Sequence, residues 1–333
     1  MNRIAILGCG AMGTVIGAYL AKSGLLVDMI DANKAHVDTL NATGAHILGA
    51  EEFTIPVQSI LPEQMEGIYD LVFLMTKQTV NGPVLTNLLQ YLGPDSVVCT
   101  LQNGIPEPFV AKYVGAERTV GGVIHWGATF KGPGTSLITT DIKAKNQAGV
   151  PLFSVGETDG ADTTRIHKIA DVLGRMGNTE VTTGLMDSRW NKLVYNCCGS
   201  GLSAACGCPY NGVLTNPKGL DCLTKIAKEV YMCAQAAGIN LAQYLLDSLP
   251  NAEKCAQLFL RVYGQDWDGK PSMLQDLEAG RKTEVDMING YVCAIGDLYG
   301  IDTPYNDMVV QVVHQIEAQA IPLSLDNLSS FPD

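Results

Sequence analysis

The sequence predicts an α/β protein in which a doubly wound parallel sheet is followed by an all-helical half. Two observations predict this fold class. In the first half, short runs rich in β-branched residues alternate with segments of helical periodicity, which is typical of βαβ units. From about residue 184 onward the pattern changes to long helical segments, separated by Pro-containing breaks. A chain of 333 residues is long for one hydrophobic core, so we expect two domains, 1–183 and 184–333, with the substrate cleft between them.

The individual elements follow from the same periodicities. We expect strands over residues 4–7, 26–30, 71–75, 97–101, 119–124, 152–155 and 180–182, and a helix over 14–22 that Gly24 closes. Residues 127–149 are rich in Gly, Thr and Lys and are expected to form antiparallel strands and turns. In the second half we expect helices over 185–198, 219–237, 252–263, 281–298 and 304–318, and a loosely attached tail over 322–333.

Composition and charge exclude several classes of function. The chain is 47% apolar and 17% charged, as in well-packed globular proteins, and its net charge is -12. No basic run is longer than Arg281-Lys282, so nucleic acid and anionic membranes are not expected as partners. A small anionic ligand is still compatible with this charge, because local backbone N–H groups act at short range. The remaining partner class is a small molecule.

The chain also lacks the patterns of export, membrane insertion and metal binding. The apolar run at the N-terminus is cut short by glycines, unlike that of a signal peptide, and there is no apolar stretch of about 18 residues. The ten cysteines are scattered, without the C-x-x-C pairs of a structural zinc site. We therefore expect a cytoplasmic protein with reduced thiols and no metal. The sequence does not predict the oligomeric state, and a homodimer is compatible with it.

A glycine motif directly follows the first predicted strand and opens the first predicted helix. It consists of Gly8, Cys9, Gly10, Ala11, Met12 and Gly13. Between a strand and a helix, G-x-G-x-x-G is typical of dinucleotide-binding sites. Its glycines permit a tight turn, a close approach of the backbone to a pyrophosphate and close helix–strand packing. The motif predicts a Rossmann-type dinucleotide site formed by these six residues. The alternative is a Gly-rich turn without a ligand.

Asp31 ends the second predicted strand, about 18 residues beyond Gly13. An acid at this place accepts hydrogen bonds from the adenosine ribose of NAD and repels the 2′-phosphate of NADP. The nearest cations are Lys34 and Lys22, and no Arg is available for that phosphate. NAD(H) is therefore favoured. If Asp31 instead only caps the next helix, Lys34 is available to NADP(H), so that cofactor stays open.

Two short polar segments follow later predicted strands. Thr76-Lys77-Gln78 comes after the strand that ends at Met75, and Gln102-Asn103-Gly104 after the one that ends at Leu101. Ligands bind at the carboxyl ends of strands in doubly wound sheets, which makes both segments candidates for binding. Taken alone, Asn103 beside a glycine is explained slightly better as a turn residue.

A polar stripe runs along the predicted helix 185–198. Ser188, Lys192 and Asn196 recur every four residues, whereas apolar residues occupy the other faces. Such a stripe faces either a cleft or solvent, and solvent is the commoner place for a single Lys.

Glu284 begins an i, i+4, i+8, i+11 row with Ile288, Val292 and Ile295. A carboxylate in line with a buried stripe is expected to be partnered or functional, while the alternative is an exposed first-turn Glu favoured by the helix dipole. Lys192 is its natural counter-charge, and in a partly desolvated cleft this Lys would be able to protonate a reacting oxygen.

These motifs identify a family resemblance that covers almost the whole chain. The chain resembles the ketopantoate reductases in GCGAMG at 8–13, TKQ at 76–78, QNG at 102–104, WNKLVYN at 190–196 and SMLQDLEAGRKTEVDMING at 272–290. The last two motifs are highly specific. The resemblance implies a Rossmann domain, a helical substrate domain and NAD(P)H as cofactor. It also implies hydride transfer to the ketone of a 2-keto acid, as in the conversion of 2-dehydropantoate to pantoate in pantothenate biosynthesis.

The resemblance also implies roles for single residues. Lys192 corresponds to the general acid, and Glu284 to its polar partner and a contact for the substrate hydroxyl. The remaining positions correspond to groups that orient the substrate or lie close to the cofactor: Asn196 and Ser272 on the substrate side, Lys77 on the cofactor side and Asn103 on both.

The chain departs from the family pattern at two places. Ser200, followed by Gly201, stands where the pantoate enzymes commonly have Asn-Pro, and Asp31-Ala32 stands where NADP-using members often have Arg. Ser is shorter than Asn and lacks its amide, so Ser200 predicts a substrate pocket of different size or shape. Three functions stay open: reduction of ketopantoate, NAD-dependent turnover of another bulky 2-keto acid of the D-mandelate type, and a non-catalytic NAD(P) sensor.

Overall fold

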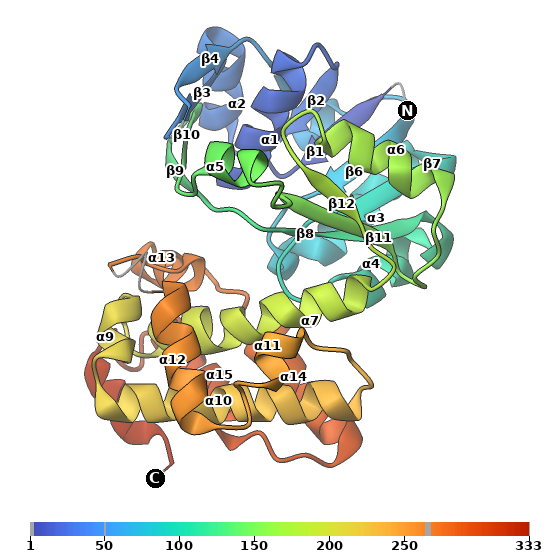
Figure 1. Ribbon diagram of the computed structural model, residues 1–333. Helices are drawn as coiled ribbons and strands as arrows, with labels where there is room; N and C mark the ends of the chain where they lie inside the picture. The colour runs from blue at the N-terminus through green and yellow to red at the C-terminus, as the bar shows by residue number, and fades with distance from the viewer. Residues whose placement is uncertain (1–2, 50, 264–267, 333) are drawn as a thin grey trace. The chain divides into compact units, whose positions relative to one another are not determined.

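The computed structural model describes residues 3–49, 51–263 and 268–332 (Figure 1). The chain forms two compact units. Unit 1 comprises Met1–Gln102 and Pro106–Leu185, and unit 2 comprises Asn103–Ile105 and Met186–Asp333. The tripeptide Asn103–Ile105, which follows the strand β7, thus folds with the second half of the chain.

Unit 1 contains the doubly wound sheet that the sequence predicts. Its strand order is β12-β11-β8-β7-β6-β1-β2-β5, and each neighbouring pair is parallel except β11 with β8. The chain moves outward from β1 through β2 to β5, and then returns to the other side of β1 with β6. The strands are β1 (Ile4–Leu7), β2 (Val27–Ile30), β5 (Gln58–Ile60), β6 (Tyr69–Leu74), β7 (Leu92–Thr100), β8 (Thr119–Ile124), β11 (Phe153–Glu157) and β12 (Thr179–Val181).

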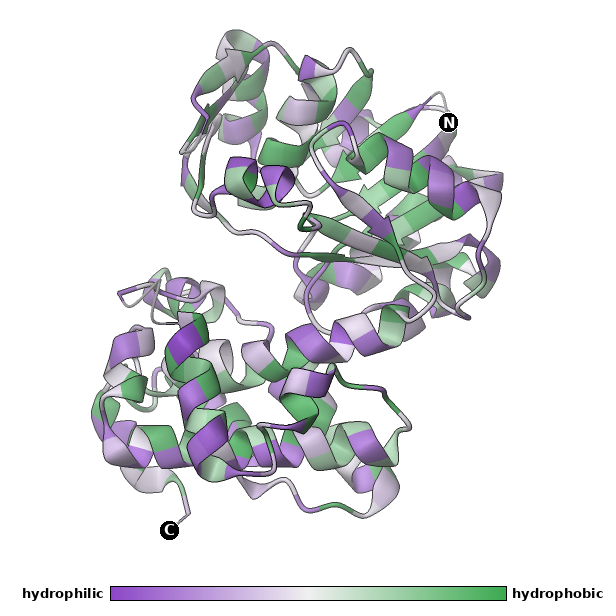
Figure 2. Cartoon of the chain, viewed as in Figure 1, coloured by the Kyte–Doolittle hydropathy of each residue, from purple (hydrophilic) through white to green (hydrophobic). Residues whose placement is uncertain are grey.

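The central strands are buried on both faces. All four residues of β1 and all six of β8 are buried, as are the last four of β6. Figure 2 shows these strands coloured as hydrophobic. Parallel strands covered by helices on both faces have continuous apolar runs rather than an alternating pattern. This is why the sequence predicted these strands within a few residues.

The helices of unit 1 are α1 (Ala11–Lys22), α2 (Lys34–Thr43), α3 (Asn81–Leu88), α4 (Glu107–Val114), α5 (Ile142–Gln147) and α6 (Thr164–Leu173). A second, four-stranded sheet has the order β4-β3-β10-β9. Its strands are β3 (Ala45–Leu48), β4 (Phe53–Ile55), β9 (Ala128–Gly132) and β10 (Thr135–Ile138).

The prediction for residues 127–149 is partly wrong. β9 and β10 are antiparallel, as expected, but the rest of the segment contains the helix α5. The Asp141 side chain accepts a hydrogen bond of 2.9 Å from Ala144 N and so caps the start of α5. Lys145 Nζ donates to His125 O at 2.7 Å and ties the helix to the large sheet. Capping and one tertiary contact thus outweigh the turn-forming composition.

The secondary-structure elements described in unit 2 are all helical. They are α7 (Leu185–Tyr195), η5 (Asn196–Gly201), α8 (Leu202–Ala205), α9 (Tyr210–Leu214), α10 (Pro217–Ala236), α11 (Gln243–Leu246), α12 (Ala252–Tyr263), α13 (Ser272–Glu278), η7 (Val285–Met287), α14 (Asn289–Tyr299), α15 (Pro304–Glu317) and η8 (Leu325–Ser330). In Figure 2 the long helix α10 has both hydrophilic and hydrophobic faces, as expected for a helix that covers a core.

Two predicted helices of this half are interrupted. The helix predicted over 185–198 changes at Asn196 into the π-helical segment η5. The helix predicted over 281–298 is wrong at its start, because residues 281–284 are not helical and α14 begins only at Asn289 after the short 3₁₀ helix η7. Ile288, between the two, has φ -115° and ψ -86°, which breaks the row from Glu284 to Ile295.

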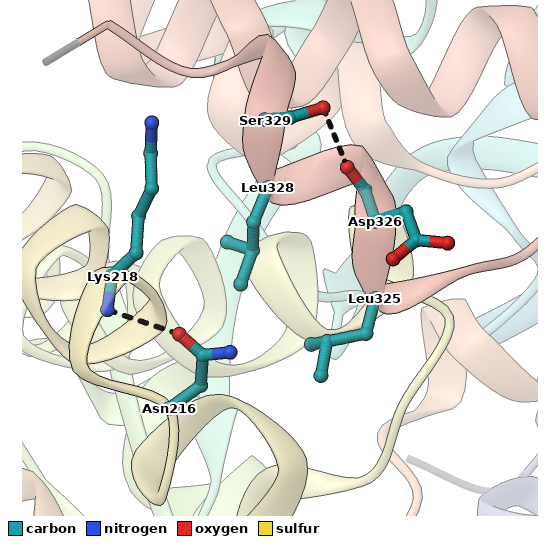
Figure 3. A pocket seen from close by; sticks show the side chains of 6 residues that line it. All are labelled: Asn216, Lys218, Leu325, Asp326, Leu328 and Ser329. Atoms are coloured by element: carbon teal, nitrogen blue, oxygen red, sulfur yellow. Dashed lines mark hydrogen bonds between the residues drawn. The ribbon is translucent and has the colours of Figure 1, made fainter.

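The prediction of a loose tail over 322–333 is wrong for its described part. Phe331 is 2% exposed and Leu328 is 4% exposed, and both belong to the core of unit 2. Asn327 Nδ2 donates to Ala205 O at 3.0 Å. Figure 3 shows η8 beside the start of α10, where Leu328 lies between the two. The four large apolar residues of this segment are interspersed with Ser, Asp, Asn and Pro and were too weak a signal to reveal this packing.

We predict that Phe331→Ala lowers the free energy of unfolding by about 2–4 kcal/mol, since it removes a buried aromatic side chain. Leu325→Ala, at a partly exposed position of the same η8 segment, is the matched control and should cost less than about 1 kcal/mol. Urea denaturation followed by circular dichroism measures both. Equal midpoints for wild type and Phe331→Ala would show that the tail is not docked.

Candidate functional site

In unit 1 the carboxyl ends of four strands lie at the same edge of the sheet. Leu7 at the end of β1 is in register with Ile30 of β2 and with Leu74 of β6, and Leu74 is in register with Thr100 of β7. The segments that directly follow these strands therefore gather at one edge. They are the glycine motif, Asp31, Thr76-Lys77 and Gln102.

The three glycines of the motif have two different roles. A side chain at Gly8 or Gly13 would clash with the backbone, whereas a side chain at Gly10 would project into open space. Gly8 has φ +104°, and a Cβ there would lie 2.5 Å from Thr76 N. A Cβ at Gly13 would lie 2.3 Å from Gly8 O, so this glycine lets α1 pack against the turn. Gly10 is exposed, and a Cβ there would meet nothing within 4 Å. The turn thus leaves open space beside Gly10, where a ligand can approach the backbone.

The start of α1 is suited to bind an anion. Its N-cap, Gly10, has no side chain to accept from the first N–H groups, and the first turn contains no acidic residue. Ala11 and Met12 in this turn are partly exposed. Cys9 differs, because its side chain is 0% exposed and Sγ lies 3.5 Å from Ile6 O. Cys9 can therefore contact a ligand only through its backbone.

Asp31 does not cap α2. Asn33 caps that helix, accepting from His36 N at 3.3 Å, while Asp31 Oδ1 accepts from Asn33 N at 2.9 Å. The interpretation of Asp31 as a helix cap is therefore wrong. Its carboxylate is close enough to the turn to raise the pKa of the Cys9 thiol, in addition to the larger effect of burial.

Both nearby lysines are engaged with other side chains. Lys34 Nζ lies 2.7 Å from Asp38 on the same helix. Lys22 Nζ lies 3.4 Å from Glu51 and 4.1 Å from the centre of the Phe53 ring. A 2′-phosphate at the end of β2 would have to compete with these carboxylates for its cation.

Gln102 connects the two polar segments beyond β6 and β7. Its Nε2 donates to Thr76 O and to Asn81 Oδ1, both at 2.7 Å, and its Oε1 accepts from Thr100 Oγ1 at 3.1 Å. Gln102 is buried, so these bonds fix the backbone next to Gly8. Lys77 follows Thr76 and is exposed. Sequence reasoning named Gln102 only as part of a motif, and its bracing role needed the sheet register.

In unit 2, the polar stripe of α7 leads into η5. Ser188, Lys192 and Asn196 are all partly exposed, while Trp190, Leu193 and Val194 are buried in the core. A π-helical turn leaves backbone carbonyls without their regular helical partners, and such turns occur frequently at functional sites.

Side chains from distant elements donate hydrogen bonds to two backbone carbonyl groups in this region. Tyr263 OH donates to Tyr195 O at 2.7 Å, and Asn289 Nδ2 donates to Cys197 O at 3.3 Å. Gly199 and Gly201 make room for them, since a Cβ at either place would lie 2.2 Å from Tyr263 OH or from Asn289 Oδ1. The unusual Gly201 is therefore explained by the close approach of Asn289. Sequence reasoning missed Tyr263 and Asn289, because only the fold brings them to η5.

Two polar atoms of η5 lack protein partners. Asn196 Nδ2 and Ser200 Oγ are buried, and neither has a hydrogen-bond partner among the described residues. A buried polar atom without a partner costs about 1–3 kcal/mol, so such atoms in a native structure call for an explanation. Both belong to predicted substrate-binding residues. A polar ligand that bonds them would remove the penalty.

Lys192 carries a perturbed ammonium group. The pKa of Lys192 is lowered to about 8 as the net result of three effects: desolvation lowers it most, the Arg189 guanidinium lowers it as well, and the Glu284 carboxylate opposes both by raising it. Glu284 is only 5% exposed, which excludes the exposed first-turn glutamate. Lys192 and Glu284 are thus electrostatically coupled, although 92 positions separate them in the sequence.

Two polar contacts hold the segment that carries Glu284. Arg281 Nη2 lies 2.8 Å from the buried Asp276. Thr283 N and Oγ1 both donate to Glu317 Oε1 at 2.7 Å. These contacts explain why 281–284 leaves the helical path, because the chain bonds to α13 and α15 instead of to its own next turn.

The remaining predicted substrate residues also belong to unit 2. Ser272 is exposed at the first position of α13, and α13 packs against η5. Asn103 lies in the tripeptide that folds with unit 2. Unit 2 thus contains Lys192, Glu284, Asn196, Ser200, Ser272 and Asn103 together. The pocket in Figure 3 is lined by other residues of the same unit.

Two further classes of site have no support in the described part of the chain. No group of three or more His, Cys, Asp or Glu side chains there is placed to hold a metal ion. None of the helices described is long and apolar enough to cross a membrane. None of the ten cysteines, all of which lie within the described residues, forms a disulfide bond.

Comparisons with known proteins agree with the two-part organisation. Residues 4–148 match the family model described as ketopantoate reductase PanE/ApbA, and residues 184–317 match the model of its C-terminal part. A 2-dehydropantoate 2-reductase from Streptococcus pyogenes is 27% identical over 318 residues, which cover 95% of this chain and 98% of that relative.

Solved structures show the same similarity. The 2-dehydropantoate 2-reductase of Geobacter metallireducens has a TM-score of 0.80 at 28% identity and covers 94% of this chain and 99% of that one. A D-mandelate dehydrogenase in complex with NADH and anilino(oxo)acetate has a TM-score of 0.81 at 25% identity, with 95% and 99% covered. The two family models together match residues 4–148 and 184–317. The chain therefore belongs to the ketopantoate reductase family of oxidoreductases.

Proposed function

We propose that this protein reduces 2-dehydropantoate to pantoate with a reduced nicotinamide cofactor. The observation that carries the proposal is Lys192, whose pKa is lowered to about 8, in the same unit as the unpartnered polar atoms of Asn196 and Ser200. An ammonium group with such a pKa is an efficient general acid near neutral pH. The choice of substrate in this proposal comes from the relatives named 2-dehydropantoate 2-reductase.

We assign the cofactor to residues 1–183 and the substrate to residues 184–333. The residues of the glycine motif fit a dinucleotide, because the space beside Gly10 and the uncapped start of α1 suit a diphosphate. Lys77 adds a positive charge at the same sheet edge, and Asn103 orients the reacting groups. The bound cofactor supplies the hydride, and the protein supplies the proton and the orientation.

The proton goes to the oxygen of the substrate ketone. Lys192 donates it as negative charge develops on that oxygen, and Glu284 keeps enough of the lysine protonated at neutral pH. Asn196 Nδ2 and Ser200 Oγ bond the polar groups of the substrate, and Ser272 contributes a hydroxyl at the start of α13. A non-catalytic NAD(P) sensor would have no use for this arrangement.

We infer a preference for NADH over NADPH. Asp31 follows β2 at the position that meets the adenosine ribose in this fold, and its negative charge disfavours a 2′-phosphate. Lys34 and Lys22, the cations that such a phosphate needs, are paired with Asp38 and Glu51.

We also infer that the protein works in the reducing environment of the cytoplasm, which is supported by the absence of disulfide bonds among its ten cysteines. The proposal holds for a monomer and for a homodimer, because every residue named in it belongs to one chain.

Turnover of a panel of keto acids tests the proposed substrate. The purified protein is incubated with NADH or NADPH and with 2-dehydropantoate, 2-ketoisovalerate or benzoylformate, and kcat/KM is measured from cofactor absorbance. The highest kcat/KM is expected for 2-dehydropantoate. A preference for benzoylformate would support a dehydrogenase of the D-mandelate type, which the similarity to the NADH-bound structure also motivates. Tight cofactor binding without turnover of any keto acid would favour the sensor.

We predict that Lys192→Ala lowers kcat by about 10²- to 10⁴-fold, because it removes the general acid. Lys254→Ala, at an exposed position of α12, is the control and should leave kcat unchanged.

In the wild type, the rate of reduction should fall as the pH rises through about 8, since only the protonated lysine donates. Glu284→Gln removes the charge that raises this pKa, so the falling limb should move to lower pH. A pH profile that Glu284→Gln leaves unmoved would contradict the coupling.

We predict that Asp31→Ala reduces the ratio of NADH to NADPH affinity by about 10-fold or more, since it removes charge-assisted bonds to the ribose and the repulsion of the 2′-phosphate. Fluorescence titration of each cofactor measures the ratio. Asp95→Ala, an exposed change at the amino-terminal part of β7, is the matched control. An unchanged ratio in Asp31→Ala would assign cofactor preference to another residue.

A further inference from the structure

A buried hydroxyl bonds the glycine turn from inside. Thr14 is 0% exposed, and its Oγ1 donates to Cys9 O at 2.7 Å. The C=O of Cys9 and the N–H of Gly10 belong to one trans peptide plane and point in opposite directions. Holding Cys9 O toward the core therefore directs the N–H of Gly10 the other way. Gly10 is the exposed glycine with open space beside it.

A buried histidine fixes the direction of this hydrogen bond. His36, on α2, is 1% exposed, and its Nε2 lies 3.1 Å from Thr14 Oγ1. Its Nδ1 accepts from Gly134 N at 2.9 Å, so in the neutral ring Nδ1 has no proton and Nε2 has one. Nε2 then donates to Thr14 Oγ1, which leaves the hydroxyl proton for Cys9 O. The three bonds form one directed chain from Gly134 N to the turn.

The surroundings keep His36 in this state. Burial lowers its pKa, while the Asp31 carboxylate and the Cys9 backbone act in the opposite direction. The Phe130 ring of β9 packs edge-on against the imidazole at 5.2 Å. Gly134, between β9 and β10, has φ +71°, a conformation that glycine adopts without strain. The small four-stranded sheet thus supplies both the ring contact and the N–H that selects the tautomer.

We propose that Thr14 and His36 are positioning residues, which hold the Cys9–Gly10 peptide so that the Gly10 N–H is presented to the diphosphate of the cofactor. This inference rests on the proposed function, because it concerns the same cofactor site. It assigns to β9, β10 and α2 a part in cofactor binding that neither the glycine motif nor the strand order implies.

Direct binding of NADH to four variants tests the inference. Thr14→Val keeps the volume of the side chain and removes the hydroxyl, and Thr14→Ser restores the hydroxyl. His36→Asn keeps an acceptor near Gly134 N and removes the donor to Thr14. Thr43→Val makes the same chemical change as Thr14→Val at an exposed position of α2 and is the control. The dissociation constant is measured by isothermal titration calorimetry, and Tm is recorded for each variant.

Thr14→Val and His36→Asn should weaken NADH binding by about 5- to 10-fold, the effect of one lost hydrogen bond. Thr14→Ser and Thr43→Val should bind as the wild type does. With a keto acid that is turned over, Thr14→Val should raise the KM for NADH and leave kcat at saturating NADH unchanged. A fall in Tm without a change in affinity would indicate a purely structural role.

Wild-type affinity in both Thr14→Val and His36→Asn would overturn the positioning role and leave the proposed function intact. If Thr14→Val does not fold, His36→Asn decides by the same criterion. A wild-type protein that binds neither NADH nor NADPH would overturn the proposed function, and the positioning role with it. The two failures are distinguished by the wild-type titration alone.

Discussion

Backbone-to-backbone packing at the start of α1 is the constraint on which unit 1 depends. Gly8 lies against Thr76, and Gly13 lies against Gly8, at distances that leave no room for a Cβ. This contact brings the first helix onto the first strand and places the polar residues beyond β6 beside the turn. Gln102 then ties β7 to the same place through Thr76. Four segments that are distant in sequence thereby form one edge, and the start of α1 at this edge has no side-chain cap.

In unit 2 the corresponding constraint is the close packing of side chains against the π-helical turn η5. A π-helical turn displaces Asn196 and Ser200 from the regular helical path and leaves carbonyls to be satisfied. Tyr263 and Asn289 satisfy two of them, and glycines at 199 and 201 let these side chains approach. Asn289 also donates to Asn306 Oδ1 at 2.9 Å, and Asn306 Nδ2 donates to the buried Glu229 at 2.7 Å. The irregular turn is thus held by a polar network in the helical core.

The elements that the sequence predicted best are those with a strong local cause. α12 matches its predicted range, and β1 and β8 match theirs, because amphipathic periodicity or a continuous apolar run defines them. The predictions of secondary structure and burial are wrong where contacts between residues far apart in the sequence determine the local structure. Residues 281–284 bond to Asp276 and Glu317 rather than forming a helix, and Phe331 enters the core from a polar tail. No local pattern encodes these partners.

The sequence by itself determined the doubly wound sheet, the helical second half, the glycine turn and the identity of the chemical groups, since each depends on residue type and short-range spacing. Only the tertiary structure decided that Glu284 is buried and close enough to act on Lys192, that Asn103 folds with unit 2, and that His36 is hydrogen-bonded to Thr14. The physical reason is that burial, electrostatic coupling and tautomer choice depend on distances through space. Positions far apart in the chain set those distances only once both units have folded.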